Sequence, residues 1–463
     1  VGTESNPLRV AIIGSGPAGF YAVSNLFKQK GLCVEIDMYE RLPSPFGLVR
    51  AGVAPDHQKD KTVMRVYDKN ARSPNFRFYG YVEYGRHIHL EDFKNHYHQI
   101  VFATGAPIDK NLGIPGEGLE GSHSATDFVA WYNGHPDYVN CRFDLSQEKV
   151  AIIGMGNVAV DVARMLCKTP EELARTDMAD HAIEALKQSK VKRVYILGRR
   201  GPAQAAFTNP EIKDMGDLND ADVTVPEEEA KLDSLSQAQL EQSQDKDKLK
   251  NVETIQAFAH RAPTGKFKLL TIRFLVSPVE IVGDDSGRVS AVKMVKNEAV
   301  KGADGSVRAK ATDRFETLPV GLVFRSVGYR GVPLPDIPFN ESKGAIDNEN
   351  GRIVSSDSRE PLVGLYAVGW IKRGPTGVIG TNKTDAKETV TCMIEDLHQT
   401  KHLTPDHPET EAASDLVTAR QPQFISYDDW LVIDEAEAAK GQESDRPRVK
   451  FTDVEDMLAV LGR

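Results

Sequence analysis

The sequence predicts an α/β protein with two Rossmann-like domains, one of which is inserted into the other. Two segments support this prediction, residues 8–28 and 149–166. Each joins a short apolar run to a glycine cluster and then to a stretch with helical periodicity, which is typical of strand, tight turn and helix. The segments start about 140 residues apart, too far for a short-period repeat, so they indicate two separate nucleotide-binding units. A chain of 463 residues has room for both.

The domain boundaries are expected where the chain crosses between the two units. The glycine-containing stretches 104–106 and 327–329 are natural crossing points. We therefore expect a discontinuous first domain formed by residues 1–106 and 332–463, and an inserted domain formed by residues 107–331.

Composition excludes several classes of protein. Hydrophobic residues make up 40% of the chain and charged residues 27%, as in a globular protein, and no apolar stretch is long enough to cross a bilayer. The four cysteines form no CxxC pair, which argues against a disulfide framework, a metal site and a redox-active dithiol. The net charge of −10 disfavours nucleic-acid binding. Because the first residues lack a signal-peptide pattern, we expect a cytoplasmic protein.

The remaining pattern gives a coarse order of elements. Loops are expected at 41–55 and 400–414, a linker at 325–331, and a C-terminal tail with one or two short helices. We expect helices at 56–72, 170–189, 226–250 and 381–397, the third of them exposed. We expect strands at 34–40, 76–82, 99–103, 193–197, 267–281, 289–296, 317–324 and 365–370.

The first glycine motif is Gly14-x-Gly16-x-x-Gly19, between a strand and a helix. Glycines at these places allow a tight turn, close approach of a pyrophosphate and close packing of helix on strand. Glu40 ends the next strand, where a carboxylate accepts hydrogen bonds from a ribose diol. The motif favours a nucleotide with a free diol, such as FAD; the alternative is a glycine turn without a ligand.

The second motif, Gly154-x-Gly156-x-x-Ala159, has alanine in the last place, which the pattern tolerates. The strand after it ends in Arg199 and Arg200 instead of an acid. Guanidinium groups bind a 2′-phosphate that a carboxylate would repel, so this site favours NADP(H) over NAD(H). The alternative is a solvated basic pair.

A third loop, residues 374–380, precedes the helix expected to begin near Thr381. In a flavoprotein with two nucleotide sites, its amides and the helix N-terminus would face the N1/O2 edge of the flavin and favour reduction. A plain loop-to-helix connection explains the same sequence equally well.

Together these motifs resemble the adrenodoxin reductase family, and most closely its actinobacterial members, the mycobacterial-type NADPH–ferredoxin reductases. The matching stretches span nearly the whole chain in family order. They are GSGPAGFYA (14–22), PFGLVRAGVAPDH (45–57), FATGA (102–106), IPGE (114–117), DFVAWYN (127–133), GMGNVAVDVAR (154–164), GRRGPAQAAFTNPE (198–211), RSVGYRG (325–331) and VGWIKRGPTGVIGTNK (368–383).

The resemblance implies FAD in the first domain and NADPH in the second, with contacts at specific residues. The FAD contacts it implies are Ala18, Glu40, Leu48, Val82, Trp370 and the amides of Gly377, Val378 and Ile379. The NADPH contacts it implies are Gly154, Met155, Gly156, Asn157, Val158, Arg199, Arg200 and Glu211, with Gly377 touching both cofactors. Lys110 stands where members of the family carry a basic residue.

Three ionisable residues are candidates for a role near the transferred hydride: His57, Asp161 and Glu211. From the sequence alone each has a structural explanation. Asp161 and Glu211 are acids near helix starts, which are favourable in any protein, and His57 is a first-turn residue that packing would stabilise. The resemblance implies that His57 and Asp161 meet across the domain interface and that Glu211 contacts the nicotinamide end. The cofactors themselves perform hydride transfer, so these residues should tune orientation and rate.

The activity that the resemblance implies is hydride transfer from NADPH to FAD, followed by single-electron transfer to an acidic iron–sulfur ferredoxin. It also implies a monomer in the bacterial cytoplasm, or in the mitochondrial matrix if the source is eukaryotic. The acidic run 227–229 departs from the basic docking helix of mammalian members, which leaves the docking face open. Other candidate docking charges are Arg50, Lys213, Lys372 and Arg373.

Rival functions differ in what they require. A thioredoxin-reductase-like enzyme needs a CxxC, and the glutamate synthase small subunit needs a cysteine-rich N-terminal segment; both are absent. An NADPH oxidase or diaphorase, a flavin monooxygenase and a non-catalytic NADPH sensor remain open. Ferredoxin reduction, peroxide release and flavin bleaching would separate them.

Overall fold

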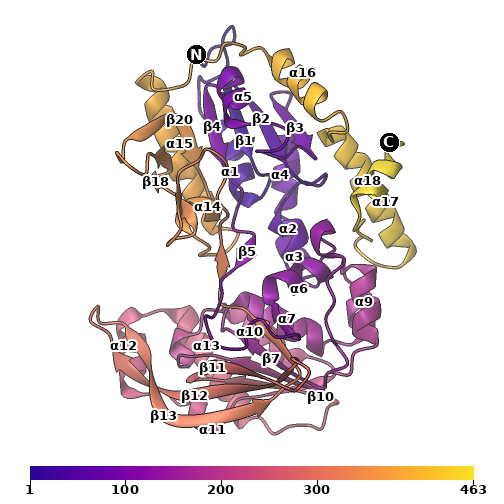
Figure 1. The fold of residues 1–463 in the computed structure, drawn as a ribbon, viewed down its shortest axis with the longest axis vertical. Helices are drawn as coiled ribbons and strands as arrows, with labels where there is room; N and C mark the ends of the chain where they lie inside the picture. Colours follow the sequence, from indigo (N-terminus) through magenta and orange to yellow (C-terminus); the bar gives the residue numbers. More distant parts are fainter. The chain divides into compact units, whose positions relative to one another are not determined.

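The computed structural model describes residues 1–463, and the chain in it forms two compact units. Unit 1 comprises Val1–Ile108 and Tyr329–Arg463, and unit 2 comprises Asp109–Gly328. In Figure 1, unit 1 is drawn in indigo to violet and in orange to yellow, with unit 2 in the colours between. The chain leaves unit 1 after Ile108 and returns at Tyr329, so unit 2 is an insertion.

Unit 1 is organised around a seven-stranded sheet in the order β18-β19-β20-β4-β1-β2-β3. Five neighbouring strands, from β20 to β3, run parallel, while β18 and β19 pair in antiparallel fashion at one edge. Because β1 lies between β2 and β4, its carboxyl end is a switch point at which α/β sheets bind ligands. The strands are β1 (Leu8–Ile13), β2 (Val34–Glu40), β3 (Phe76–Gly80), β4 (Gln99–Phe102), β18 (Asn348–Glu349), β19 (Arg352–Val354) and β20 (Pro361–Ala367).

The alternation of side chains along β1 explains why the strand is apolar throughout. Leu8, Val10 and Ile12 belong to one hydrophobic core, and Ala11 and Ile13 belong to another. Successive side chains of a strand point to opposite faces, so a strand covered on both faces contains no exposed position. All six residues of β1 are buried accordingly.

Helices α1 and α15 pack against each other in unit 1. Short strands complete the unit: β15 (Tyr329–Arg330), β16 (Phe339–Asn340) and β17 (Ala345–Ile346), while β5 (Ile108–Asp109) lies at the first crossing. The helices are α1 (Pro17–Leu26), α2 (Leu48–Ala51), α3 (Gln58–Lys61), α4 (Met64–Ala71), α5 (Leu90–His96), α14 (Trp370–Arg373), α15 (Thr381–His398), α16 (Thr410–Arg420), α17 (Tyr427–Glu443) and α18 (Val454–Val460).

Unit 2 repeats this design with a six-stranded parallel sheet in the order β6-β14-β7-β8-β10-β9. Strand β7 lies between β14 and β8 and contributes side chains to two hydrophobic cores. Val150 and Ile152 belong to one core, and Ala151 and Ile153 belong to the other. The strands are β6 (Ser122–Ser124), β7 (Lys149–Ile153), β8 (Arg193–Leu197), β9 (Ala221–Thr224), β10 (Lys268–Arg273) and β14 (Leu322–Arg325).

A separate antiparallel sheet, β11-β12-β13, and eight α-helices complete unit 2. Its strands are β11 (Val276–Gly283), β12 (Val289–Lys301) and β13 (Val307–Pro319). The helices are α6 (Ala125–Tyr132), α7 (Asn157–Cys167), α8 (Pro170–Leu173), α9 (Asp180–Lys187), α10 (Asn209–Asp214), α11 (Glu227–Ala230), α12 (Ser234–Ser243) and α13 (Lys246–His260). No helix of the chain has both the length and the apolar character needed to cross a membrane.

The single exposed helix expected at 226–250 is wrong, because this region contains three helices. Asp233 accepts hydrogen bonds from two backbone amides at the start of α12, and Asp245 does the same for α13, so each aspartate caps a new helix. Glu229 is buried instead of exposed, since it binds the Arg273 guanidinium at 2.8 Å and accepts from the amide of Phe274. The charged residues around Glu229 in the sequence did not predict that Arg273 is its partner.

Other helix predictions need smaller corrections. The helix expected from Asp56 to Arg72 is broken into α3 and α4, and His57 is the N-cap residue of α3 in place of Asp56. The expected loop at 41–55 contains α2, and Trp370 begins α14 instead of ending a strand. The C-terminal tail contains the 17-residue α17, since burial of its apolar face stabilises a helix that its polar sequence did not predict.

Candidate nucleotide sites

The turn after β1 has the geometry that its three glycines predict. Gly14 has φ +106°, and a Cβ atom there would lie 2.5 Å from the carbonyl oxygen of Ala103. A Cβ at Gly19 would lie 2.4 Å from the Gly14 oxygen. A Cβ at Gly16 would meet no protein atom within 4 Å, so protein packing does not require glycine there. The remaining reason for glycine at this helix start is close approach of a ligand.

Glu40 lies at the end of β2 and faces this turn. Its carboxylate accepts hydrogen bonds from the amide and the hydroxyl of Ser15, at 3.1 and 2.7 Å, and from the amide of Leu42 at 3.1 Å. A carboxylate has about four acceptor positions, so one remains for a ribose hydroxyl. Hydrogen bonds within the protein thus hold the Glu40 carboxylate next to the turn, and the sequence did not predict these bonds.

The other expected contacts of unit 1 differ in exposure. Ala18 and Val82 are buried, and Val82 donates its amide to the Glu40 carbonyl, whereas Leu48 is 41% exposed. The Trp370 indole donates to the carbonyl of Thr376 at 3.2 Å and lies against the ring of Tyr329.

Helix α15 begins at Thr381, as expected, without a side-chain N-cap. Gly377 has φ +80°, which explains glycine at this place in the loop. The Val378 amide donates to the Thr381 hydroxyl at 3.1 Å, so it is already engaged within the protein. No hydrogen bond joins the amides of Gly377 and Ile379 to protein acceptors, and these two remain available to a ligand.

The turn after β7 reproduces the geometry of the first turn. Gly154 has φ +141°, and a Cβ there would lie 2.0 Å from the Ser326 carbonyl oxygen, while a Cβ at Gly156 would again meet nothing within 4 Å. Met155 accepts from the amide of Ala206, and the Asn157 side chain accepts from the amide of Thr208 at 2.8 Å. These bonds join the turn to the loop after β8; Val158 is partly buried in the first turn of α7.

Arg199 and Arg200 follow β8, and both side chains are exposed. Their backbone carbonyls are fixed by Asn297 and Leu275, but neither guanidinium forms an ion pair. Partial burial, together with the charge of Arg199, lowers the pKa of Arg200. Two adjacent cations without a protein anion form a site suited to a doubly charged phosphate.

Asp161 on α7 and Glu211 on α10 are brought together by Arg164, a residue the sequence analysis missed. The Arg164 guanidinium, 2% exposed, lies 2.6 Å from the Asp161 carboxylate and 3.0 Å from that of Glu211. The spacing of Asp161 and Arg164, three residues on one helix, was the available signal. In unit 1, His57 is the N-cap residue of α3 and its ring nitrogen lies 3.9 Å from Asp60. Lys110 is exposed and donates its amide to Gly328.

Comparison with known proteins gives a consistent result. A family model described as pyridine nucleotide-disulphide oxidoreductase matches residues 8–201. NADPH-ferredoxin reductase FprA of Mycobacterium tuberculosis is 43% identical and aligns over 98% of this chain and 99% of its own length. NADPH:adrenodoxin oxidoreductase, mitochondrial, of Arabidopsis thaliana is 37% identical over 99% of this chain and 96% of its own. The structure of M. tuberculosis FprA in complex with NADPH superimposes with a TM-score of 0.92 at 42% identity, covering 98% of this chain and 99% of that one.

The chain belongs to the adrenodoxin reductase family of NADPH–ferredoxin reductases. The predicted family and the predicted fold class, with two Rossmann-like domains, are confirmed. All four cysteines are free thiols.

Within this reductase fold, two of the candidate docking charges are wrong. Arg50 is buried and paired with Glu437, and Lys372 is buried among Asp385 and Glu388. Arg373 also faces Asp385. A partner protein needs accessible charge, so the exposed Lys213 keeps this role as a candidate, and the docking role of the partly exposed Arg373 stays a prediction.

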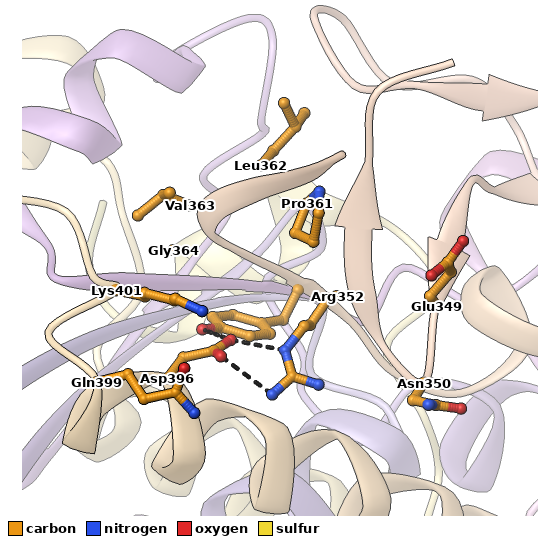
Figure 2. A pocket seen from close by; sticks show the side chains of 11 residues that line it. Glu349, Asn350, Arg352, Pro361, Leu362, Val363, Gly364, Asp396, Gln399 and Lys401 are labelled. Atoms are coloured by element: carbon orange, nitrogen blue, oxygen red, sulfur yellow. Dashed lines mark hydrogen bonds and ion pairs between the residues drawn. The ribbon is translucent and has the colours of Figure 1, made fainter. Parts of the chain in front are cut away.

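A cavity of about 310 Å³ lies on unit 1 at the β18–β20 edge of the sheet. Figure 2 shows Arg352 and Asp396 joined by hydrogen bonds in its lining, with Pro361 and Leu362 higher in the view. Arg352 forms two hydrogen bonds with Asp396, at 2.8 and 3.0 Å, so the main charges of this cavity neutralise each other. It lies at the far edge from β1 and β2, and the nucleotide turns do not contribute to it.

Proposed function

We propose that this chain is an FAD-dependent NADPH–ferredoxin reductase in which unit 1 holds FAD and unit 2 holds NADPH. The observation that supports this most strongly is the contrast between two turns of the same geometry. The strand beside the first turn ends in a carboxylate, and the strand beside the second ends in two unpaired guanidinium groups. Both turns leave open space at their second glycine, so both fit a pyrophosphate.

In unit 1, Gly14, Gly16 and Gly19 would admit the FAD pyrophosphate to the start of α1, and Glu40 would bind the ribose. The amides of Gly377 and Ile379 would face the flavin ring ahead of α15. Their partial positive charge, and that of the helix terminus, would stabilise negative charge on the ring. Bound FAD supplies the chemistry of accepting a hydride and releasing its electrons singly.

In unit 2, Gly156 and the start of α7 would hold the NADPH pyrophosphate, while Arg199 and Arg200 would bind the 2′-phosphate in bidentate fashion. Arg164 fixes the carboxylates of Asp161 and Glu211 in place. Glu211 would then orient the nicotinamide end, and His57 of unit 1 would tune the rate of hydride transfer. These residues position groups and need not transfer protons.

The acceptor that we propose is an acidic iron–sulfur ferredoxin, bound by a monomeric reductase in the cytoplasm. The exposed Lys213, Lys246 and Lys250 of unit 2 are the charges on which docking could rest. Such charges raise the association rate with an acidic partner more than they raise affinity.

The test is an anaerobic absorbance titration of the purified protein with NADPH, and in parallel with NADH. We expect a yellow protein whose absorbance near 450 nm bleaches with stoichiometric NADPH and more slowly with NADH. Addition of a ferredoxin should then restore the colour as the acceptor is reduced. A colourless protein, or a flavin that NADPH never reduces, would overturn the proposal; peroxide release without ferredoxin reduction would favour an oxidase.

A further inference from the structure

A short loop in unit 1 links the first nucleotide turn to the C-terminal end of the chain. This loop, residues 46–51, contains α2 and is called here the covering loop. The Phe46 amide donates to the Ser15 carbonyl at 3.0 Å, and a Cβ at Gly47 would lie 2.9 Å from the Cα of Gly16. Phe46 and Gly47 both have positive φ, at 83° and 50°, so the loop keeps a conformation that the turn beneath it imposes.

The other side of the covering loop contacts residues 427–451, called here the C-terminal arm. The Arg50 guanidinium forms two hydrogen bonds with the Glu437 carboxylate, at 2.7 and 2.5 Å, and lies 5.0 Å from the centre of the Trp430 ring. Lys450 donates to the Arg50 carbonyl at 3.0 Å. The ring of Phe46 meets the Trp430 ring edge-on at 6.1 Å.

Glu437 is fully buried, and every one of its partners is identified. Besides Arg50, it accepts from Arg448 at 3.1 Å and from the amide of Phe451 at 2.9 Å. Burial alone would raise the pKa of Glu437, but the adjacent Arg50 charge holds it below the ordinary value. The carboxylate is therefore ionised and joins the covering loop to two positions of the arm, Arg448 and Phe451.

We propose that the C-terminal arm holds the covering loop against the first nucleotide turn through the Arg50–Glu437 pair, and so sets how slowly FAD leaves the protein. The inference rests on the proposed function, because it assigns FAD to that turn. Arg50 and Glu437 are positioning residues: they act on the cofactor through the loop and do not touch it.

The test measures the rate at which FAD dissociates from the holoprotein, followed by the rise in flavin fluorescence after dilution. Glu437→Gln keeps the shape of the side chain and leaves the buried Arg50 guanidinium without an anion, while Arg448 keeps its ion pair with Asp434. FAD release should therefore accelerate about ten-fold or more. Arg50→Lys, which keeps the charge but loses the bidentate geometry, should give a smaller acceleration.

The matched control is Asp396→Asn, at the cavity of Figure 2. It breaks a bidentate pair with Arg352 on the same unit, at the far edge of the sheet. It should lower the unfolding temperature without changing FAD release. Unchanged release in both Glu437→Gln and Arg50→Lys, or equal acceleration in Asp396→Asn, would overturn the inference while leaving flavin reduction by NADPH intact. A wild-type protein without flavin would overturn the proposed function as well.

Discussion

At the scale of single residues, we infer that cofactor choice rests on the side chains at the ends of two equivalent strands. Glu40 after β2 is held by three internal hydrogen bonds, whereas Arg199 and Arg200 after β8 have no protein anion. The difference matters because an internally bonded side chain also supports the fold, while an unpaired one can be removed at little structural cost. Substitution at Arg199 should therefore report ligand binding alone.

We predict that Arg199→Ala reduces discrimination between NADPH and NADH about ten-fold or more. Loss of a hydrogen bond to the charged 2′-phosphate costs about 1.5–3 kcal/mol, and NADH has no 2′-phosphate to lose. The measurement is kcat/KM for both nucleotides. Arg193→Ala, an exposed arginine at the other end of β8, is the control. An equal loss with both nucleotides would contradict the assignment.

A second residue-scale prediction concerns His57. We expect His57→Gln to leave FAD bound and to slow flavin reduction by NADPH about ten-fold or more, because misplacement near the hydride affects rate while the cofactor chemistry persists. Stopped-flow absorbance under anaerobic conditions measures this. His398→Gln, at the end of α15, should reduce at the wild-type rate. Unchanged kinetics in His57→Gln would refute the assigned role.

Residue-scale sequence reasoning predicts chemistry from position within a unit, and it failed where a tertiary contact decides. Arg199 and Arg200 follow a recognisable strand, and their role in binding NADP(H) stays a prediction. The sequence predicts Arg50 and Lys372 as docking charges, but tertiary contacts pair them with Glu437 and Asp385, and no local pattern indicates these partners. The hydrogen bond from the Val378 amide to Thr381 is local, three residues along the chain, and the sequence does not show which amides of a loop are engaged in this way.

At the scale of elements, the strand–turn–helix units separate two reasons for glycine. Gly154 is required by the backbone, since it has φ +141° and a Cβ would collide with Ser326. Gly156 has φ −112° and open space around its Cβ position, so only a ligand explains it. The sequence motif identifies both glycines as parts of one nucleotide turn, but it does not show that the backbone requires one of them and a ligand explains the other.

We therefore predict that Gly156→Ala raises KM for NADPH about ten-fold while the unfolding temperature and the FAD content stay unchanged. The added methyl group would crowd the nucleotide, and overpacking of this kind costs about 1–3 kcal/mol. Gly154→Ala is the contrasting variant and should lower the unfolding temperature. Steady-state kinetics and thermal unfolding together decide the matter; destabilisation by Gly156→Ala would show that the protein itself fills that space.

Helix boundaries were the least predictable elements. The polar stretch after residue 226 reads as one helix by periodicity, but Asp233 and Asp245 cap two new ones. Aspartate is tolerated inside a helix and favoured at its start, so the sequence alone does not decide between these roles. Strands β2 and β8 were predicted closely, because apolar and acidic residues alternate along the first part of β2, and β8 is a short apolar run that follows charged residues.

At the scale of the whole molecule, the inserted arrangement was predictable because each glycine motif marks one unit. Contacts between the N-terminal and C-terminal segments of unit 1 were not predictable, because the whole of unit 2 separates these segments in the sequence. The ion pair between Arg50 and Glu437 joins residues 387 positions apart, and no local sequence pattern predicts it. Charge also acts at this scale: the net value of −10 would repel an acidic partner, so docking must depend on local basic groups.

This leads to a prediction about salt. We expect kcat/KM for an acidic ferredoxin to fall steadily as ionic strength rises from about 0.05 to 0.5 M, because the Debye length shortens from about 14 to 4 Å and screens the attraction that steers docking. Ferricyanide is the control acceptor, because it is small and needs no docking face. Its rate of reduction reports how fast NADPH reduces the flavin, and so shows any effect of salt on nucleotide binding. At saturating NADPH the ferricyanide rate should change little. A ferredoxin rate that is equally insensitive to salt would show that recognition is apolar, and a rate that rises with salt would show that the overall repulsion outweighs the local basic groups.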